Sequence, residues 1–175
     1  MKRHPALISL SRDHHDGLVQ ASRLRRAAAD GDSSARLATA SEFVEFFKNE
    51  ERVHLRDEEE ELFPLLLRHV QSQPAPLREA RAQHMQLEGF ARQLEIAVAA
   101  GSVDREMLAA AGILFEAHIR LEERQLFPLI EQLVPDDELR RLGLAARDVT
   151  CAVRRRPSRA SGSSGEPTAG DAAVI

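Results

Sequence analysis

His54-Leu-Arg-Asp-Glu-Glu-Glu-Glu-Leu-Phe-Pro64 is the first of two copies of one sequence pattern, and the second is His118-Ile-Arg-Leu-Glu-Glu-Arg-Gln-Leu-Phe-Pro128. Both copies follow HxxxEExxLFP, in which a histidine precedes a glutamate by four residues. On a helix this spacing places both side chains on one face, one turn apart. Imidazole and carboxylate groups bind first-row transition metals. The repeated pattern therefore predicts two helices that face each other across a metal site.

Four stretches of the chain carry apolar residues at helical spacing, about residues 5–29, 35–70, 77–100 and 104–133. The break at residues 30–34 supplies N-cap candidates for the second helix, and Asp104 is a candidate for the fourth. Long amphipathic helices with short connections predict an all-α, up-down-up-down four-helix bundle. A short extra helix should follow, from Pro135 to about Ala146.

Two regions are expected along the chain. We assign residues 1–150 to the bundle and residues 151–175 to a disordered C-terminal tail. From Arg154 onward the sequence is rich in Arg, Ser, Gly, Pro and Ala and has no periodicity, which is typical of disordered segments. Pro64 and Pro128 fall inside helical patterns, so we expect a kink there with the helix continuing beyond it.

Six residues on the inward stripes of the four helices form the predicted ligand set: His14, His54, Glu58, His84, His118 and Glu122. At 1.5 Å per residue, His14 lies roughly 24 Å from the end of its helix and His54 roughly 28 Å from the start of the next. The two histidines should therefore lie at similar heights in the bundle. Six nitrogen and oxygen donors exceed a tetrahedral zinc site and suit two six-coordinate ions that share carboxylates, which favours iron or manganese.

Other histidines and glutamates near these positions were weighed as ligands. His15 is the alternative to His14, but it shares its face with Ser22 and two arginines. Glu88 follows His84 by four residues and is a candidate seventh ligand. Glu59 and Glu123, next to the two motif glutamates, are expected to support the ligands from outside or to face solvent.

A ferritin-like di-metal site is a competing pattern, with Glu-x-x-His on two helices and a single Glu on each of the other two. Glu51-Arg-Val-His54 matches this pattern once. Before His118, the corresponding position is occupied by Phe115. Before His84, the corresponding position is not a Glu either. The ferritin-like pattern is therefore not met.

Composition limits the possible partners. The net charge of −4 gives no reason to expect a nucleic acid, and no apolar run approaches the roughly 20 residues of a membrane span. The basic N-terminus leads into no signal-peptide stretch, so we expect a cytoplasmic protein without a membrane partner. Cys151 is the single cysteine, which excludes an intrachain disulfide, and the chain has no Tyr or Trp.

The order His, HxxxE, His, HxxxE, with LFP after both HxxxE motifs, resembles the hemerythrin-like family with its HHE cation-binding domain. The opening Leu10-Ser-Arg-Asp-His14-His15 is similar to the motif of that family's first helix. The likeness covers about residues 6–133. It implies a four-helix bundle around a non-heme di-iron centre, with His14, His54, His84 and His118 as terminal ligands. It also implies that Glu58 and Glu122 bridge the ions.

One departure from the family bears on function. Its oxygen carriers have five histidines, two of them one turn apart on the third helix, whereas here Glu88 follows His84 and Arg81 precedes it. We therefore expect two iron ions, with manganese or zinc as alternatives, that meet O2 or a related oxidant such as peroxide or NO. An enzyme that disproportionates peroxide or reduces NO, and a non-catalytic iron or oxygen sensor, are the alternatives.

Overall fold

The computed structural model describes residues 3–142, and these residues form helices with no β-strand. The helical elements are η1 (Pro5–Leu7), α1 (Ile8–Asp30), α2 (Ser33–Phe46), η2 (Phe47–Glu51), α3 (Arg52–Asp57), η3 (Glu58–Leu62), α4 (Phe63–Leu67), α5 (Ala75–Ala99), α6 (Arg105–Leu121), η4 (Glu122–Leu126) and α7 (Phe127–Leu133). The predicted all-α class is thereby confirmed for this part of the chain.

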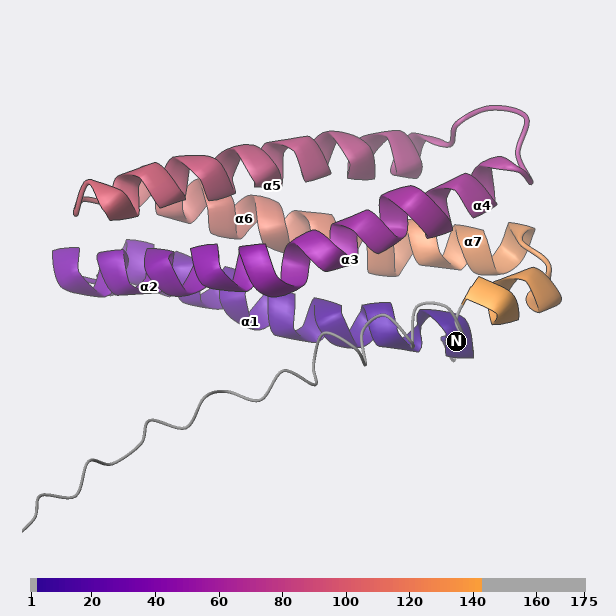
Figure 1. Cartoon of the computed structure of the whole chain (residues 1–175), viewed down its shortest axis with the longest axis horizontal. Helices are drawn as coiled ribbons and strands as arrows, with labels where there is room; N and C mark the ends of the chain where they lie inside the picture. Colours follow the sequence, from indigo (N-terminus) through magenta and orange to yellow (C-terminus); the bar gives the residue numbers. More distant parts are fainter. Residues whose placement is uncertain (1–2, 143–175) are drawn as a thin grey trace, which may run out of the picture.

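Long helical runs lie lengthwise beside one another (Figure 1). They are α1, the run from α2 to α4, α5, and the run from α6 to α7. Helix α1 contacts α2 and α6, and α5 also contacts α2 and α6. This arrangement is consistent with a helical bundle, while the strict up-down-up-down order of the runs stays a prediction.

The breaks between the helices have identifiable causes. The Asp32 carboxylate accepts a hydrogen bond from Ala35 N at 2.8 Å and caps α2, and Asp104 caps α6 through Met107 N at the same distance. Gly101, just beyond α5, takes a φ of +71°, which favours glycine. The predicted N-cap positions are confirmed.

Two glycines allow α1 and α6 to pack closely. A Cβ atom at Gly17 would meet Ile119 and Phe115 side-chain atoms at 2.8 and 2.9 Å, and one at Gly112 would meet the Ala21 carbonyl oxygen at 2.9 Å. A larger residue at position 112 would meet the backbone of α1 and push the two helices apart, whereas one at position 17 would require the ends of the Ile119 and Phe115 side chains to shift. The site described below draws one histidine from each of these helices, so their close approach also sets the width of the site.

The prolines of the two LFP motifs do not end the helices. The chain remains helical through Pro64 and Pro128, as predicted, but the turn before each proline is a π turn, Glu58–Leu62 and Glu122–Leu126. Such wide turns are frequent at functional sites. A third π turn, Phe47–Glu51, precedes α3 and was not predicted from the sequence.

The C-terminal predictions are tested only in part. Residues 136–142 are helical, which confirms the start of the short extra helix. Its predicted end near Ala146, the domain boundary at residue 150, Cys151 and the tail lie outside the described residues. Among residues 3–142, no helix is both long enough and apolar enough to cross a membrane.

Candidate metal centre

A polar layer separates two apolar clusters inside the protein. One cluster contains residues such as Leu24, Phe43 and Leu94, and the other contains residues such as Leu66 and Ile130. Between them lie the six predicted ligands, all of them buried: His14, His54, Glu58, His84, His118 and Glu122. Burying ionisable groups is costly unless charges or hydrogen bonds compensate them. The cost indicates that this layer has a function.

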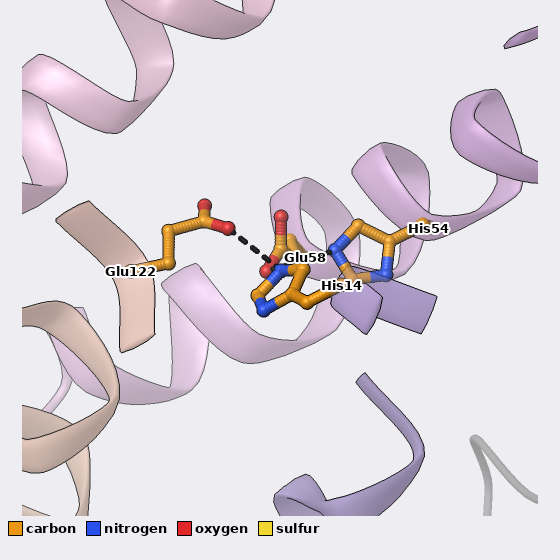
Figure 2. Close-up of side chains that lie close together, drawn as sticks. All are labelled: His14, His54, Glu58 and Glu122. Atoms are coloured by element: carbon orange, nitrogen blue, oxygen red, sulfur yellow. Dashed lines mark hydrogen bonds and ion pairs between the residues drawn. The ribbon is translucent and has the colours of Figure 1, made fainter. Parts of the chain in front are cut away.

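The structure brings these residues together as two groups of four. His14, His54, Glu58 and Glu122 form one group, and Glu58, His84, His118 and Glu122 form the other. Within each group, one ligand atom per residue lies within 4.8 Å of all the others. Both glutamates belong to both groups, so each carboxylate can face two ions at once. Figure 2 shows the first group, with Glu122 reaching His14 from another helix.

Each glutamate spans the two groups through its separate oxygens. Glu58 Oε1 lies 3.5 Å from His54 Nε2, and Glu58 Oε2 lies 3.4 Å from His84 Nε2. Glu122 Oε2 lies 3.0 Å from His14 Nε2, and Glu122 Oε1 lies 3.5 Å from His84 Nε2. These carboxylates therefore have the placement that a bridge between two cations needs.

The atoms that face the centre of the site lack ordinary partners. Both oxygens of Glu58 and of Glu122, and the Nε2 atoms of His84 and His118, are buried without a hydrogen bond from any residue in the range 3–142. His14 Nε2 and His54 Nε2 lie 3.0 Å apart, within hydrogen-bond distance, and each offers a lone pair there when its ring proton is on Nδ1. Converging lone pairs and unpaired carboxylates are the pattern that fits bound cations.

Carboxylates hold the outer nitrogens of the single-histidine helices. His14 Nδ1 lies 2.8 Å from Glu123 Oε1, and His84 Nδ1 lies 3.0 Å from Glu59 Oε1. Each carboxylate comes from the second glutamate of an HxxxEE motif. A hydrogen bond from Nδ1 fixes the ring orientation and directs the Nε2 lone pair inward. Glu59 and Glu123 thus support the site from outside, which was one of the two roles predicted for them.

An aromatic ring and an arginine also accompany each of the two single histidines, His14 and His84. The ring of Phe127 stacks on His14 at 5.2 Å between centroids, and Phe63 stacks on His84 at 5.5 Å. Arg3 lies over Phe127 and also bonds Glu123. A matching set of contacts is formed at the other histidine, where Arg81 lies over Phe63 and bonds Glu59 at 2.9 Å. The two halves of the site are therefore near copies of each other.

The histidines of the two HxxxE motifs have different outer partners. His54 Nδ1 lies 3.6 Å from Asp13 Oδ2, whereas His118 Nδ1 lies 3.3 Å from Gln83 Oε1. Asp13 and Gln83 immediately precede the single histidines in the sequence. Neither residue was predicted from the sequence, although their matched positions before His14 and His84 are a signal that could have identified them.

Acidic neighbours keep protons on the single histidines. Burial lowers the pKa of His14, but the nearby carboxylates of Glu122, 3.0 Å from its Nε2, and of Glu123 outweigh this effect and raise the pKa to about 9. At His84, burial is again outweighed by Glu122 and Glu58, which raise the pKa to about 10. Without metal the site therefore binds protons near neutral pH, and a cation must displace them.

The pKa values of the HxxxE motif residues shift in different directions. Burial lowers the pKa of His54, but the charge of Glu58 reverses this and raises it well above its usual value. Burial lowers the pKa of His118 to about 4. Burial raises the pKa of Glu58, yet the neighbouring histidines, led by His54, hold it well below its usual range. Glu58 is thus ionised at neutral pH and can neutralise a cation.

The alternative ligands lie elsewhere. His15 is exposed, whereas His14 is buried in the site. The Glu88 side chain is 43% exposed and forms an ion pair with Arg92 at 3.2 Å, outside both four-residue groups. His69 lies outside both groups and pairs with Glu138 at 3.3 Å. The geometry therefore favours His14 over His15 and gives no support to Glu88 as a seventh ligand.

Comparison with known proteins agrees with this arrangement. The family model described as the hemerythrin HHE cation binding domain matches residues 6–130. The chain belongs to this family. All six predicted ligands fall inside the matched range. No curated protein and no solved structure matches the chain significantly.

Glu51 is the buried residue whose importance the sequence did not reveal. It is 5% exposed and lies three residues before His54, at the end of the unpredicted π turn. The sequence showed it only as one isolated match to the ferritin-like pattern. Within the hemerythrin-type bundle it becomes an additional carboxylate beside the centre.

Proposed function

We propose that the six buried residues bind two iron ions and that this centre binds O2 or a related small oxidant such as peroxide or NO. The single observation that carries the proposal is the pair of four-donor groups that share Glu58 and Glu122. Membership of a cation-binding family supports it independently. We also propose the up-down-up-down order of the four runs, which lets each run contribute a histidine to one layer.

The donor set suits iron rather than zinc or magnesium. Each position would receive two imidazoles and two shared carboxylates, four donors in all, which leaves room on a six-coordinate ion for solvent and for a small ligand. Carboxylate-only oxygen sites suit magnesium or calcium, and structural zinc sites are built with cysteine thiolates, which this donor set lacks. Two ferrous ions would supply the electrons that a bound oxidant accepts.

The protein's own residues would control charge, ligand orientation and water. The negative charges of Glu58 and Glu122 offset part of the charge of two dications. Glu59 and Glu123 hold the outer nitrogens of His84 and His14, so these rings cannot rotate away. Fully buried apolar side chains surround the layer and exclude bulk water: Phe47, Leu62, Phe115 and Leu126.

Anaerobic loading with Fe²⁺, followed by exposure to air, tests the proposal. We expect two irons per chain and a change in the near-ultraviolet spectrum on oxidation. A matched pair of variants isolates the site: Glu122→Ala should lose both properties, and Glu88→Ala, at an exposed carboxylate, should keep them. A wild-type protein that binds no iron, or whose spectrum does not change in air, would contradict the proposal. Turnover of added hydrogen peroxide in the same preparation would extend the function to an enzyme.

A further inference from the structure

The two halves of the centre differ at two matched positions, although their inner ligands are alike. Three residues before the motif histidine, the first half has Glu51 and the second has Phe115. Immediately before the single histidine, the first half has Asp13 and the second has Gln83. At both positions a carboxylate in the half of His14 and His54 is replaced by a neutral side chain in the half of His84 and His118.

Glu51 is a buried carboxylate beside one half of the centre. It is 5% exposed, and among residues 3–142 it has no hydrogen bond and no ion pair. The imidazoles whose charges act on it most strongly are His54 and then His14, and both belong to the first half. A cation in that half would add a further favourable charge close to this carboxylate.

Burial raises the pKa of Glu51 to about 7. A dication in the first half would favour its ionised form, because opposite charges stabilise each other. The corresponding position in the second half offers no such group, since Phe115 is fully buried and packs against Phe43 at 5.8 Å between ring centroids. The additional negative charge is thus confined to one side of the layer.

Asp13 adds to this difference through His54. Its Oδ2 lies 3.6 Å from His54 Nδ1, whereas the amide oxygen of Gln83 lies 3.3 Å from His118 Nδ1. A carboxylate near the outer nitrogen makes an imidazole a stronger ligand than a neutral amide does. The other two histidines do not contribute to the asymmetry, because Glu123 and Glu59 serve them in the same way.

We propose that Glu51 and Asp13 make the two metal positions unequal, so that the position of His14 and His54 binds the first cation and favours the higher charge. This inference rests on the proposed metal centre and adds the order in which its positions fill. Glu51 acts as a charge near the ion rather than as a ligand, since it belongs to neither four-residue group. Glu51 therefore acts through its charge alone, and Asp13 acts through His54.

Partial loading with Co²⁺ tests the order. Crystals of the full chain loaded with half an equivalent of Co²⁺ would be measured by anomalous scattering, which gives the occupancy of each position separately. We expect about tenfold higher occupancy between His14 and His54 than between His84 and His118, as one additional buried charge on that side would produce. Equal occupancy, or a preference for the other position, would overturn the inference while leaving the metal centre in place.

Three variants assign the effect to its residues. Glu51→Gln keeps the shape of the side chain and removes its charge, so the two occupancies should become closer to equal. Gln83→Glu adds a carboxylate beside His118 and should shift Co²⁺ toward the second position. Glu88→Gln, at an exposed carboxylate, should leave the ratio unchanged. An unchanged ratio in both Glu51→Gln and Gln83→Glu would overturn the inference, and absence of Co²⁺ from both positions of the wild type would overturn the metal centre as well.

Discussion

The first and second HxxxEExxLFP segments build the same local structure from the same few residues. In both, the second glutamate holds the histidine of a neighbouring helix, and the phenylalanine stacks on that same histidine. In both, a π turn begins at the motif glutamate and precedes the proline. The segments differ one turn earlier, where Glu51 corresponds to Phe115. The comparison shows that the repeated segment supplies four of the six predicted ligands and the carboxylates that hold the other two, whereas residues outside it distinguish the two halves.

The largest expected effect concerns what the halves share. Replacing Glu58 or Glu122 with Ala should abolish metal binding at both positions, because each carboxylate faces both groups. Replacing His118 should weaken only the second half, and replacing His54 only the first. Metal analysis after loading and desalting measures both outcomes. Retention of two ions by Glu122→Ala would show that the carboxylates do not link the halves.

A change of pH should affect both halves through the protons on their histidines. The pKa values of His14 and His84 are raised to about 9 and about 10 in the metal-free protein. Cations compete with these protons, so apparent affinity should rise with pH up to 9–10 and fall about tenfold per pH unit below that for each proton displaced. A competition titration with a chromophoric chelator measures this slope. An affinity that does not change between pH 6 and 9 would contradict the titration described here.

The outer carboxylates should have smaller and half-specific effects. Glu123→Gln should weaken the first position and Glu59→Gln the second, each by roughly 10–100-fold, as is typical when the partner of a ligating imidazole is lost. Glu88→Gln is the control at an exposed carboxylate. The affinities come from the same chelator competition, with the occupancy of each position read by anomalous scattering. Equal weakening of both positions by one variant would indicate that the outer hydrogen bonds do not act locally.

The smallest effect lies outside the centre and compares two helix ends. Asp32→Ala and Asp104→Ala each remove a cap hydrogen bond at the start of α2 and of α6. We expect a loss of about 1 kcal/mol in the free energy of unfolding for each variant, with metal affinity unchanged. Urea denaturation of the metal-free protein measures the loss. A change in metal content in either variant would mean that helix ends and centre are coupled.

Much of the site could be predicted from residue spacing because a helix fixes which side chains share a face. The four-residue spacing within the HxxxE motifs identified the inward glutamates, and the apolar stripe distinguished His14 from exposed His15. For Glu59 and Glu123 the sequence predicted either support of the ligands from outside or exposure to solvent, and the structure supports the first role. That the six inner residues bind metal remains a prediction, which the geometry supports.

The remaining features depend on information that local periodicity does not contain. The π turn at Phe47–Glu51 changes which face Glu51 occupies, and no proline marks it in the sequence. The contacts of Asp13 with His54 and of Gln83 with His118 depend on the separation and rotation of neighbouring helices. Packing sets those quantities, so the asymmetry of the centre emerges only in three dimensions.

The central claim is that two cations share Glu58 and Glu122. Mössbauer spectroscopy of the protein loaded with ⁵⁷Fe²⁺ and then oxidised in air tests it most directly, together with the iron content per chain. We predict two irons per chain, magnetically coupled through shared ligands and therefore diamagnetic at low temperature. One iron per chain, or two irons that behave as isolated paramagnets, would contradict the account.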